Sequence, residues 1–254
     1  MCIRDRNSTG HGDIIQLDDG RNYMVLLGIR NEIERGSNMG RETFIAPVTW
    51  EREPFEWKEN KDLWPVVAPQ TGRVERLNEV VFSGTSQKLK TSFIDDFSSD
   101  KLDLKWNFRR YPIENIFHLN KEKNRLELMC HPNQIKERGR SALLGFKQSE
   151  SSFEYIVQMN FDPISNRSEA GMSIFQKDDN YINFTLIKKE DNMLLQAYAV
   201  KDAKLITKVS EQLNEYNGTL KLKIISDEEN YKLYYSVDEI IFNYFTTLNG
   251  DVIK

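Results

Sequence analysis

The chain of 254 residues carries a formal net charge of −4, and 29% of its residues are charged and 11% aromatic. This length favours one or two domains, and the aromatic content argues against a disordered chain. The weak negative charge gives no reason to expect nucleic acid or an anionic membrane as a partner. No segment approaches the roughly 18 apolar residues of a membrane-spanning helix.

The extreme N-terminus and the cysteines bear on the cellular compartment. The first six residues, MCIRDR, are not followed by the apolar region of a signal peptide, and we interpret residues 1–6 as an assembly or gene-calling scar. Cys2 and Cys130 lie far apart in the sequence, so a disulfide framework is not indicated. A reducing compartment is slightly favoured, which leaves localisation open with the cytoplasm preferred over secretion.

The first predicted elements form a meander of short strands. The apolar residues Ile14, Ile15 and Leu17 precede Asp18-Asp19-Gly20, and Asp-Gly is the strongest short hairpin signal. Residues 23–27 are apolar on both faces, which is typical of a strand buried between sheets. After a polar loop, residues 43–50 predict another strand, and Pro47 within it indicates an edge or an irregular strand. Such a meander is typical of a β-propeller blade.

The rest of the chain predicts a linker and then a β-sandwich. Residues 68–92 are rich in Gly, Ser, Thr and Gln and weak in apolar periodicity, as expected of an inter-domain linker. Short strands separated by Asn- and Asp-rich turns follow, which predicts an antiparallel sandwich. The predicted strands are residues 125–130, 141–146, 153–161, 170–176, 181–188, 193–200, 204–209, 219–226, 231–237 and 240–246.

Five motifs near the N-terminus resemble one enzyme family when they are taken in order. They are Gly10-His11-Gly12-Asp13, Tyr23 to Arg30, Gly40-Arg41-Glu42-Thr43, Pro47-Val48-Thr49-Trp50 and Trp64-Pro65-Val66-Val67. Together they resemble the end of the catalytic domain of glycoside hydrolase family 43, the five-bladed β-propeller family of β-xylosidases and α-L-arabinofuranosidases. The order and spacing of the set make it more specific than any single motif.

The resemblance continues beyond residue 90. Asp95-Asp96-Phe97, Glu169 to Gln176 and Asp178-Asp179-Asn180-Tyr181 resemble the concanavalin A-like β-sandwich that follows the propeller in the xylosidase branch. The resemblance therefore implies an all-β chain truncated at both ends. Residues 7–67 are expected to be the last part of the propeller, residues 68–92 the linker, and residues 93–254 a sandwich that is incomplete at its C-terminus.

The resemblance also implies the chemistry. Inverting glycosidases use a carboxylic acid to protonate the leaving oxygen and a carboxylate to activate water. The family implies an Asp base, a pKa-tuning Asp and a Glu acid, all earlier in chain order than His11. We therefore nominate neither Asp13 nor Glu42 as a catalytic group, and we interpret Asp18 and Asp19 as hairpin-turn residues. The enzyme is expected to be an exo-acting hydrolase, and this fragment is expected to be inactive.

Two side chains are candidate site residues. A lone His before a strand is often a hydrogen-bonded structural residue, but the resemblance places His11 near the propeller axis, where it could bind a metal ion or water or orient the acidic groups. Arg41 could be solvated or could pair with Glu42. The resemblance instead places Arg41 in the sugar pocket, as a donor to substrate hydroxyls, and Gly40 would let the backbone turn tightly before it.

No cofactor is expected to be required, although a structural Ca²⁺ remains an alternative. The acidic turns Asp95-Asp96 and Asp178-Asp179-Asn180 could bind calcium but lack EF-hand spacing, which favours solvated turns. Trp57, Trp64 and Trp106 could stack on sugars, whereas aromatic residues in sheet proteins usually belong to the core.

Two function classes stay open at this point. The first is a glycoside hydrolase fragment whose partners are xylo-oligosaccharides or arabinoxylan-derived sugars, in a chain that could form a homo-oligomer. The second is a non-catalytic carbohydrate-binding sandwich. The segments around His11 and Arg41 favour the first, because a pure binding module would not need a propeller remnant. The sequence does not separate β-xylosidase from α-L-arabinofuranosidase.

Overall fold

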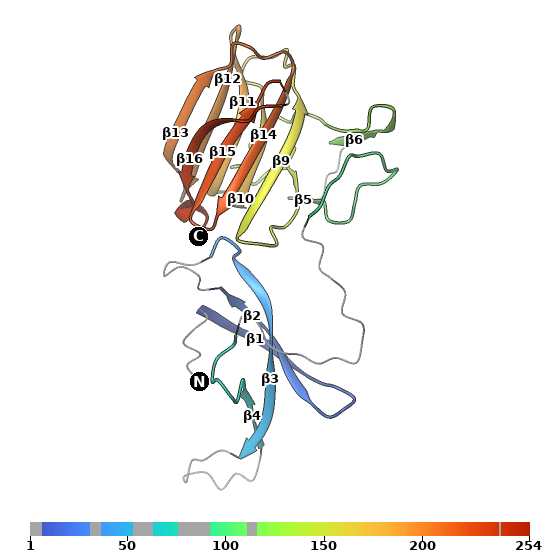
Figure 1. Ribbon diagram of the computed structural model, residues 1–254, viewed down its shortest axis with the longest axis vertical. Helices are drawn as coiled ribbons and strands as arrows, with labels where there is room; N and C mark the ends of the chain where they lie inside the picture. The colour runs from blue at the N-terminus through green and yellow to red at the C-terminus, as the bar shows by residue number, and fades with distance from the viewer. Residues whose placement is uncertain (1–6, 31–36, 53–62, 76–91, 111–115, 239) are drawn as a thin grey trace. The chain divides into compact units, whose positions relative to one another are not determined.

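The computed structural model describes residues 7–30, 37–52, 63–75, 92–110, 116–238 and 240–254. The chain divides into two compact units, Met1–Gln87 together with Lys254, and Lys88–Ile253 (Figure 1). Nearly all regular elements described are strands, so the all-β prediction is confirmed. The two short 3₁₀ helices are η1 (Lys121–Lys123) and η2 (Gly250–Ile253). No helix among the described residues is long and apolar enough to cross a membrane.

The first unit contains one four-stranded antiparallel sheet. Its strands are β1 (Asn7–Gln16), β2 (Asn22–Ile29), β3 (Arg41–Arg52) and β4 (Leu63–Val67), and they follow one another in space in chain order. The predicted hairpin joins β1 to β2. Gly20 adopts a φ of +86°, and Asp19 accepts a hydrogen bond from the backbone N–H of Arg21, 3.1 Å. Glycine suits this position because it has no Cβ to strain the turn.

Pro47 lies at the point where the third strand acquires a second neighbour. β3 is an interior strand, because it pairs with β2 on one side and with β4 on the other. The ladder between β3 and β4 stops at Val48 and Val67, and the next backbone bond runs from the Ala68 N–H to the Pro47 carbonyl, 2.8 Å. Pro47 has no N–H to return, and the Ala68 carbonyl instead accepts from the Gly72 N–H at 2.7 Å. The edge-strand prediction therefore holds only for the N-terminal half of β3.

The core of the first unit lies on one face of its sheet. Side chains alternate along β3, so Phe44, Ala46 and Val48 point to the same face and are buried. Leu26 and Val67 from the neighbouring strands join them, and so do Ala68 and Val74 from the segment after β4. Residues 68–75, which were expected to begin the linker, therefore pack on the first unit. Residues 76–91 of the predicted linker lie outside the described part.

The second unit is built from two four-stranded antiparallel sheets. One has the order β10-β11-β12-β13 and the other the order β16-β15-β14-β9. The strands are β9 (Ser152–Asn160), β10 (Glu169–Lys177), β11 (Asn180–Lys189), β12 (Asn192–Lys201), β13 (Lys204–Gln212), β14 (Thr219–Asp227), β15 (Asn230–Ser236) and β16 (Asn243–Asn249). Two small ladders pair β5 (Asn107–Phe108) with β8 (Leu144–Gly145) and β6 (Phe117–Asn120) with β7 (Arg125–Leu128).

The core of the second unit lies between the two large sheets, which Figure 1 shows stacked face to face. Alternate residues of β11, among them Phe184 and Leu186, are fully buried and pack with Leu220 and Leu222 of β14. The helix η2 adds Val252 and Ile253 to the same cluster. This sandwich confirms the predicted concanavalin A-like architecture in its main features.

The predicted final strand begins later than expected. Residues 240–246 were predicted as a strand, whereas β16 starts at Asn243. The cause is a turn centred on Asp238, whose carboxylate accepts hydrogen bonds from the backbone N–H groups of Ile240 and Ile241 at 3.0 and 2.9 Å. The Ser236 hydroxyl donates to the same oxygen, 2.8 Å. These donors stabilise the charged carboxylate and lower the pKa of Asp238 to about 2.

Candidate functional site

His11 lies at an irregularity in strand β1. Gly10 is opposite Leu27 and Asp13 is opposite Val25, so one extra residue is inserted into β1. His11 has a φ of 47°, a left-handed conformation that non-glycine residues seldom adopt, and its side chain is exposed. Bulges of this kind turn a side chain away from the regular alternation and are common near active sites.

Arg41 is the first residue of β3. It follows Gly40, whose φ is +66°, and a turn in which the Gly40 N–H donates to the Ser37 carbonyl at 3.3 Å. This confirms the expected tight turn at Gly40. The Arg41 side chain is exposed, and alternation places it on the face opposite Phe44, away from the core of the first unit.

The structure places the two predicted site residues on the same sheet but not beside one another. β2 lies between their strands. Arg41 is opposite Ile29 of β2, whereas Gly10, the residue before His11, is opposite Leu27. Neither side chain makes a hydrogen bond or ion pair within the described chain. The roles predicted for His11 and Arg41 are therefore unchanged by the structure and stay predictions.

A partly buried ion pair of the first unit was not anticipated. Arg30 donates to Glu42 at 2.6 Å, and the two side chains are only 13% and 19% exposed. Glu42 therefore pairs with Arg30, not with Arg41. The second carboxylate oxygen of Glu42 is buried and has no hydrogen-bond partner among the described residues. The sequence signal for this position was the alternation of side chains along β3, which puts Glu42 on the same face of the sheet as Phe44.

The described residues contain no group of three or more His, Cys, Asp or Glu side chains that could hold a metal ion. In the acidic turn after β10, Asp178 pairs with the Arg109 guanidinium, and Asp179 lies 3.2 Å from the Lys177 ammonium. Asp95 accepts hydrogen bonds from the Phe97 N–H and, at 2.7 Å, from the indole N–H of Trp106. These contacts give the acidic turns structural roles, and metal binding at His11 stays a prediction.

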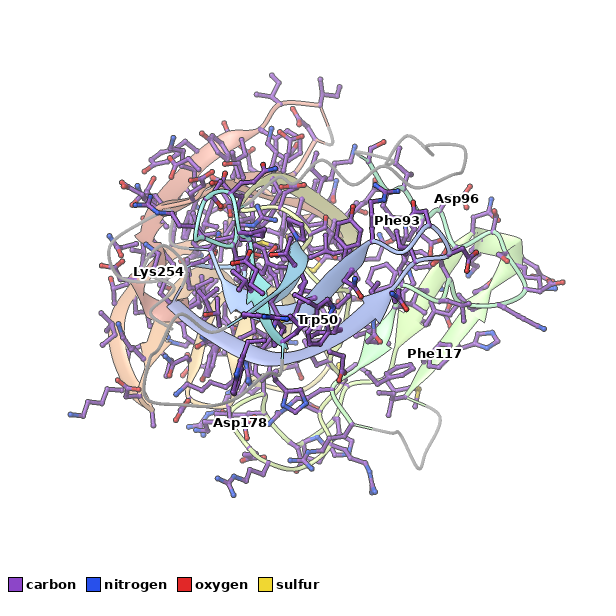
Figure 2. All side chains as sticks on the ribbon, turned by 90° about the horizontal axis from the view of Figure 1, so that it is seen from below. Trp50, Phe93, Asp96, Phe117, Asp178 and Lys254 are labelled. Carbon is purple, nitrogen blue, oxygen red and sulfur yellow. The ribbon has the colours of Figure 1, made fainter. Side chains whose placement is uncertain are left out.

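The tryptophans predicted as core or sugar-stacking residues differ from one another. Trp106 packs edge-on against Phe93 and Phe146, with ring centroids 6.1 and 5.2 Å away, so it is structural. Figure 2 labels Phe93, one of the three rings of this cluster. Trp64 is 48% exposed at the edge strand β4. Trp57 lies outside the described residues.

A polar network covers the outer face of the sheet β10-β13. The Glu169 Oε1 atom accepts hydrogen bonds from the Thr185 hydroxyl (2.6 Å), the Gln196 amide (3.0 Å) and the Tyr198 hydroxyl (3.2 Å). The Asn183 amide donates to the Tyr198 hydroxyl at 2.7 Å. Glu169, Ser173, Asn183, Thr185, Gln196 and Tyr198 are called the polar face below. In the sequence the polar face is visible only as polar residues at alternate positions of separate strands. Their meeting on one face could not be found without the registers of these strands.

A hollow of about 710 Å³ adjoins the polar face. Tyr181 and Val200, which pair across β11 and β12, line it from the sheet. Residues 136–138 line it from the loop before β8, and this loop is fixed by Arg109, which donates to the Ile135 carbonyl at 2.6 Å. The Tyr181 and Tyr198 rings meet edge-on with their centroids 6.3 Å apart, so the hollow lies next to the polar face.

Comparison with known proteins identifies the second unit. Residues 94–253 match the family model GH43_C2, described as the β-xylosidase C-terminal concanavalin A-like domain. The chain is 30% identical over 191 residues to a "Xylosidase/arabinosidase" from Butyrivibrio fibrisolvens, covering 73% of this chain and 34% of that protein. It is 26% identical over 222 residues to "Non-reducing end alpha-L-arabinofuranosidase BoGH43B" from Bacteroides ovatus, covering 87% of this chain and 40% of that protein.

A solved structure shows the same fold. The structure "Bacteroides ovatus Xyloglucan PUL GH43B" superposes with a TM-score of 0.82 at 23% identity, over 98% of this chain and 47% of that chain. The chain thus spans less than half the length of the relatives it matches. The predicted sandwich and the predicted resemblance are both confirmed by the match over residues 94–253. The chain belongs to the family of β-xylosidase C-terminal concanavalin A-like domains of glycoside hydrolase family 43.

Proposed function

We propose that this chain is part of an inverting, exo-acting glycoside hydrolase that acts on xylo-oligosaccharides or on arabinose side chains of plant hemicellulose. The observation that carries the proposal is the family match over residues 94–253, joined in one chain to a separate four-stranded meander. The names of the two curated relatives, a xylosidase/arabinosidase and an α-L-arabinofuranosidase, support the substrate class.

The meander of the first unit supports its assignment as the last part of a β-propeller. Propeller blades are four-stranded antiparallel sheets that pack neighbouring blades on both faces. Here the face opposite the core is also apolar, with Tyr23, Val25 and Leu27 on β2 and Ile45 on β3. A sheet that is apolar on both faces is expected where two further layers cover it.

Within this proposal, Arg41 binds the sugar and does not transfer protons. Its guanidinium would donate to substrate hydroxyls. It would also stabilise the ionised form of a nearby carboxyl group and so lower the pKa of that group. His11 would orient acidic groups or a water, since an imidazole can donate from one nitrogen and accept at the other. Both side chains are exposed in the first unit, which leaves them available for these contacts.

The catalytic carboxylates are proposed to lie in the part of the enzyme that this chain does not span. Inverting hydrolysis needs two carboxyl groups roughly 6.5–9.5 Å apart across the scissile bond. In the first unit Asp19 forms an ion pair with Arg21 in the hairpin and Glu42 forms one with Arg30, so each of these carboxylates already has a cationic partner.

Two measurements test the proposed function. Sequencing the gene on both sides of this reading frame should reveal blades that carry the Asp base and the Glu acid before His11. Assays with p-nitrophenyl β-xyloside and α-L-arabinofuranoside should show turnover for the complete protein and none for the 254-residue chain. Turnover by the short chain that disappears in Asp13→Asn or Glu42→Gln would contradict the proposal.

A further inference from the structure

The chain contains two Asn-Gly dipeptides, Asn217-Gly218 and Asn249-Gly250, and their surroundings differ. In this dipeptide the side-chain amide is open to attack by the backbone nitrogen of the next residue, because glycine has no Cβ that hinders the approach. The product is a five-membered succinimide ring, which water opens to aspartate or isoaspartate. Since the reacting groups are the same in both dipeptides, the surrounding structure decides which of them reacts.

The side-chain carbonyl group is held in the same way at both sites. The Asn217 Oδ1 atom accepts a hydrogen bond from the Thr219 N–H at 3.1 Å, and the Asn249 Oδ1 atom accepts one from the Asp251 N–H at 2.7 Å. Both are Asx turns, in which the side chain bonds to the backbone two residues further on. A donor on this oxygen also polarises the carbonyl group and activates its carbon. The carbon that is attacked therefore does not distinguish the two sites.

The backbone nitrogen that attacks is held differently. The Gly250 N–H donates to the Glu229 carbonyl at 2.7 Å, whereas the Gly218 N–H makes no hydrogen bond within the described chain. Gly218 is held through its carbonyl, which accepts from the Phe161 N–H at 3.1 Å. A backbone nitrogen must lose its proton before it attacks, and a hydrogen bond to a carbonyl opposes this loss. The Gly218 nitrogen is thus available for the reaction, and the Gly250 nitrogen is not.

The space around the two glycines differs as well. Gly218 has a φ of +98°, and nothing lies within 4 Å of a Cβ built on it. At Gly250 such an atom would lie 2.7 Å from the Glu229 carbonyl oxygen and 3.3 Å from the Tyr231 ring. Asn217 is exposed, whereas Gly250 is buried. Ring closure needs the side chain and the next peptide group to rotate towards each other, and the surroundings of Gly218 leave room for this.

The segment after Asn249 is also fixed by contacts with other strands. The Val252 carbonyl accepts a hydrogen bond from the Asn180 amide at 3.0 Å, and the Asp251 carbonyl accepts one from the Lys201 ammonium at 2.7 Å. Val252 itself belongs to the core of the second unit. A succinimide at Asn249 would require this segment to open first, and opening of a segment that packs on the core costs much of the stability of the unit.

We propose that Asn217 is a site of spontaneous deamidation and that Asn249 is protected from the same reaction. The deprotonated Gly218 nitrogen attacks the Cγ carbon of Asn217, the bond from Cγ to the side-chain nitrogen breaks, and ammonia leaves. Water is the only co-reactant, and it opens the succinimide at either of the two carbonyl carbons. Opening at Cγ gives aspartate in a normal backbone, and opening at the backbone carbonyl carbon gives isoaspartate.

The reaction changes the turn that leads into β14. The Asn160 amide donates to the Thr219 hydroxyl at 2.7 Å, and the Phe161 N–H donates to the Gly218 carbonyl, so this turn joins β14 to the end of β9. Isoaspartate lengthens the backbone before Gly218, and both products add a negative charge. The site lies within the second unit, and the proposal does not depend on the proposed hydrolase activity.

Ageing of the 254-residue chain in mildly alkaline buffer, followed by peptide mass spectrometry, tests the proposal. Trypsin places the two asparagines in different peptides, residues 209–221 and 233–254, and fragmentation assigns each mass gain to one asparagine. An unaged sample corrects for conversion during digestion. We expect Asn217 to convert at least about tenfold faster than Asn249. The converted peptide should separate into two chromatographic peaks of equal mass, because a succinimide opens to both isoaspartate and aspartate.

The matched control is the same chain aged in guanidinium chloride. Unfolding removes the hydrogen bond between Gly250 and Glu229, so the two asparagines should then convert at similar rates. Equal rates in the folded chain, faster conversion of Asn249, or aspartate as the sole product at Asn217 would overturn the proposal. A difference that persists in the denaturant would also overturn it, because the cause would then be the flanking sequence and not the structure.

Discussion

Arg30 and Glu42 form an ion pair of 2.6 Å on the face of the first sheet that also carries the apolar core. Arg30 directly follows β2, and Glu42 is the second residue of β3, where it lies opposite Gly28. The ion pair therefore lies at the end of the ladder between β2 and β3, beside the apolar core.

Removal of one partner should destabilise the first unit. Glu42→Ala leaves the Arg30 guanidinium largely buried, and loss of a charged hydrogen bond typically costs about 1.5–3 kcal/mol. A double-mutant cycle with Arg30→Ala, measured by urea unfolding, should give a coupling free energy of about 1 kcal/mol or more. The control is the Asp19–Arg21 pair, which is 51% and 42% exposed and should contribute much less, because solvent screens an exposed ion pair. Equal effects of the two pairs would contradict this prediction.

Gly171→Ala should disrupt the contact between β10 and β11. A Cβ there would lie 2.3 Å from the Phe184 carbonyl oxygen and 2.6 Å from the Thr185 Cα, so the backbone must move. Overpacking of this kind typically costs about 1–3 kcal/mol. Gly145→Ala is the control, because nothing lies within 4 Å of its added Cβ. Urea unfolding of both variants checks the difference, and an unchanged Gly171→Ala midpoint would show that the strands separate without cost.

Asp238 should make the sandwich less stable in acid. Its pKa in the folded chain is lowered to about 2 by the N–H donors of Ile240 and Ile241 and by Ser236, whereas an unfolded Asp has a pKa of about 3.9. A lowered pKa means that the contribution is present above about pH 4 and is lost as the pH falls towards 2. Asp238→Asn should flatten the dependence of the melting temperature on pH in this range. Asp191→Asn, at an exposed turn residue, should keep the unmodified profile.

Arg41→Ala in the complete enzyme should weaken catalysis without unfolding the protein. If Arg41 donates to the sugar, the lost charged hydrogen bonds cost about 1.5–3 kcal/mol each, which corresponds to a roughly ten- to more than hundredfold fall in kcat/KM. Arg41→Lys should restore only part of the activity, since an ammonium lacks the planar fork of donors. An unchanged kcat/KM at an unchanged melting temperature would remove Arg41 from the substrate site.

The sequence by itself determined the strands and the family. Alternation such as Leu220, Leu222 and Ile224 predicts a half-buried strand because successive side chains point to opposite faces, and β14 has this burial pattern. Asp-Gly at residues 19–20 predicts the hairpin from local turn geometry. The motifs around Asp95 and Glu169 are linear in the sequence, so the sandwich could be recognised without coordinates.

Only the tertiary structure decided which strands and side chains meet. β9 pairs with β14 across more than fifty residues of intervening chain, and no local pattern specifies such a partner. Arg30 reaches Glu42, and Gln196 and Tyr198 reach Glu169, only because the registers of separate strands bring them to one face. A one-residue slip in any of these ladders would turn every side chain of that strand to the other face. The ion pair and the polar face are therefore properties of strand pairing, which long-range packing fixes.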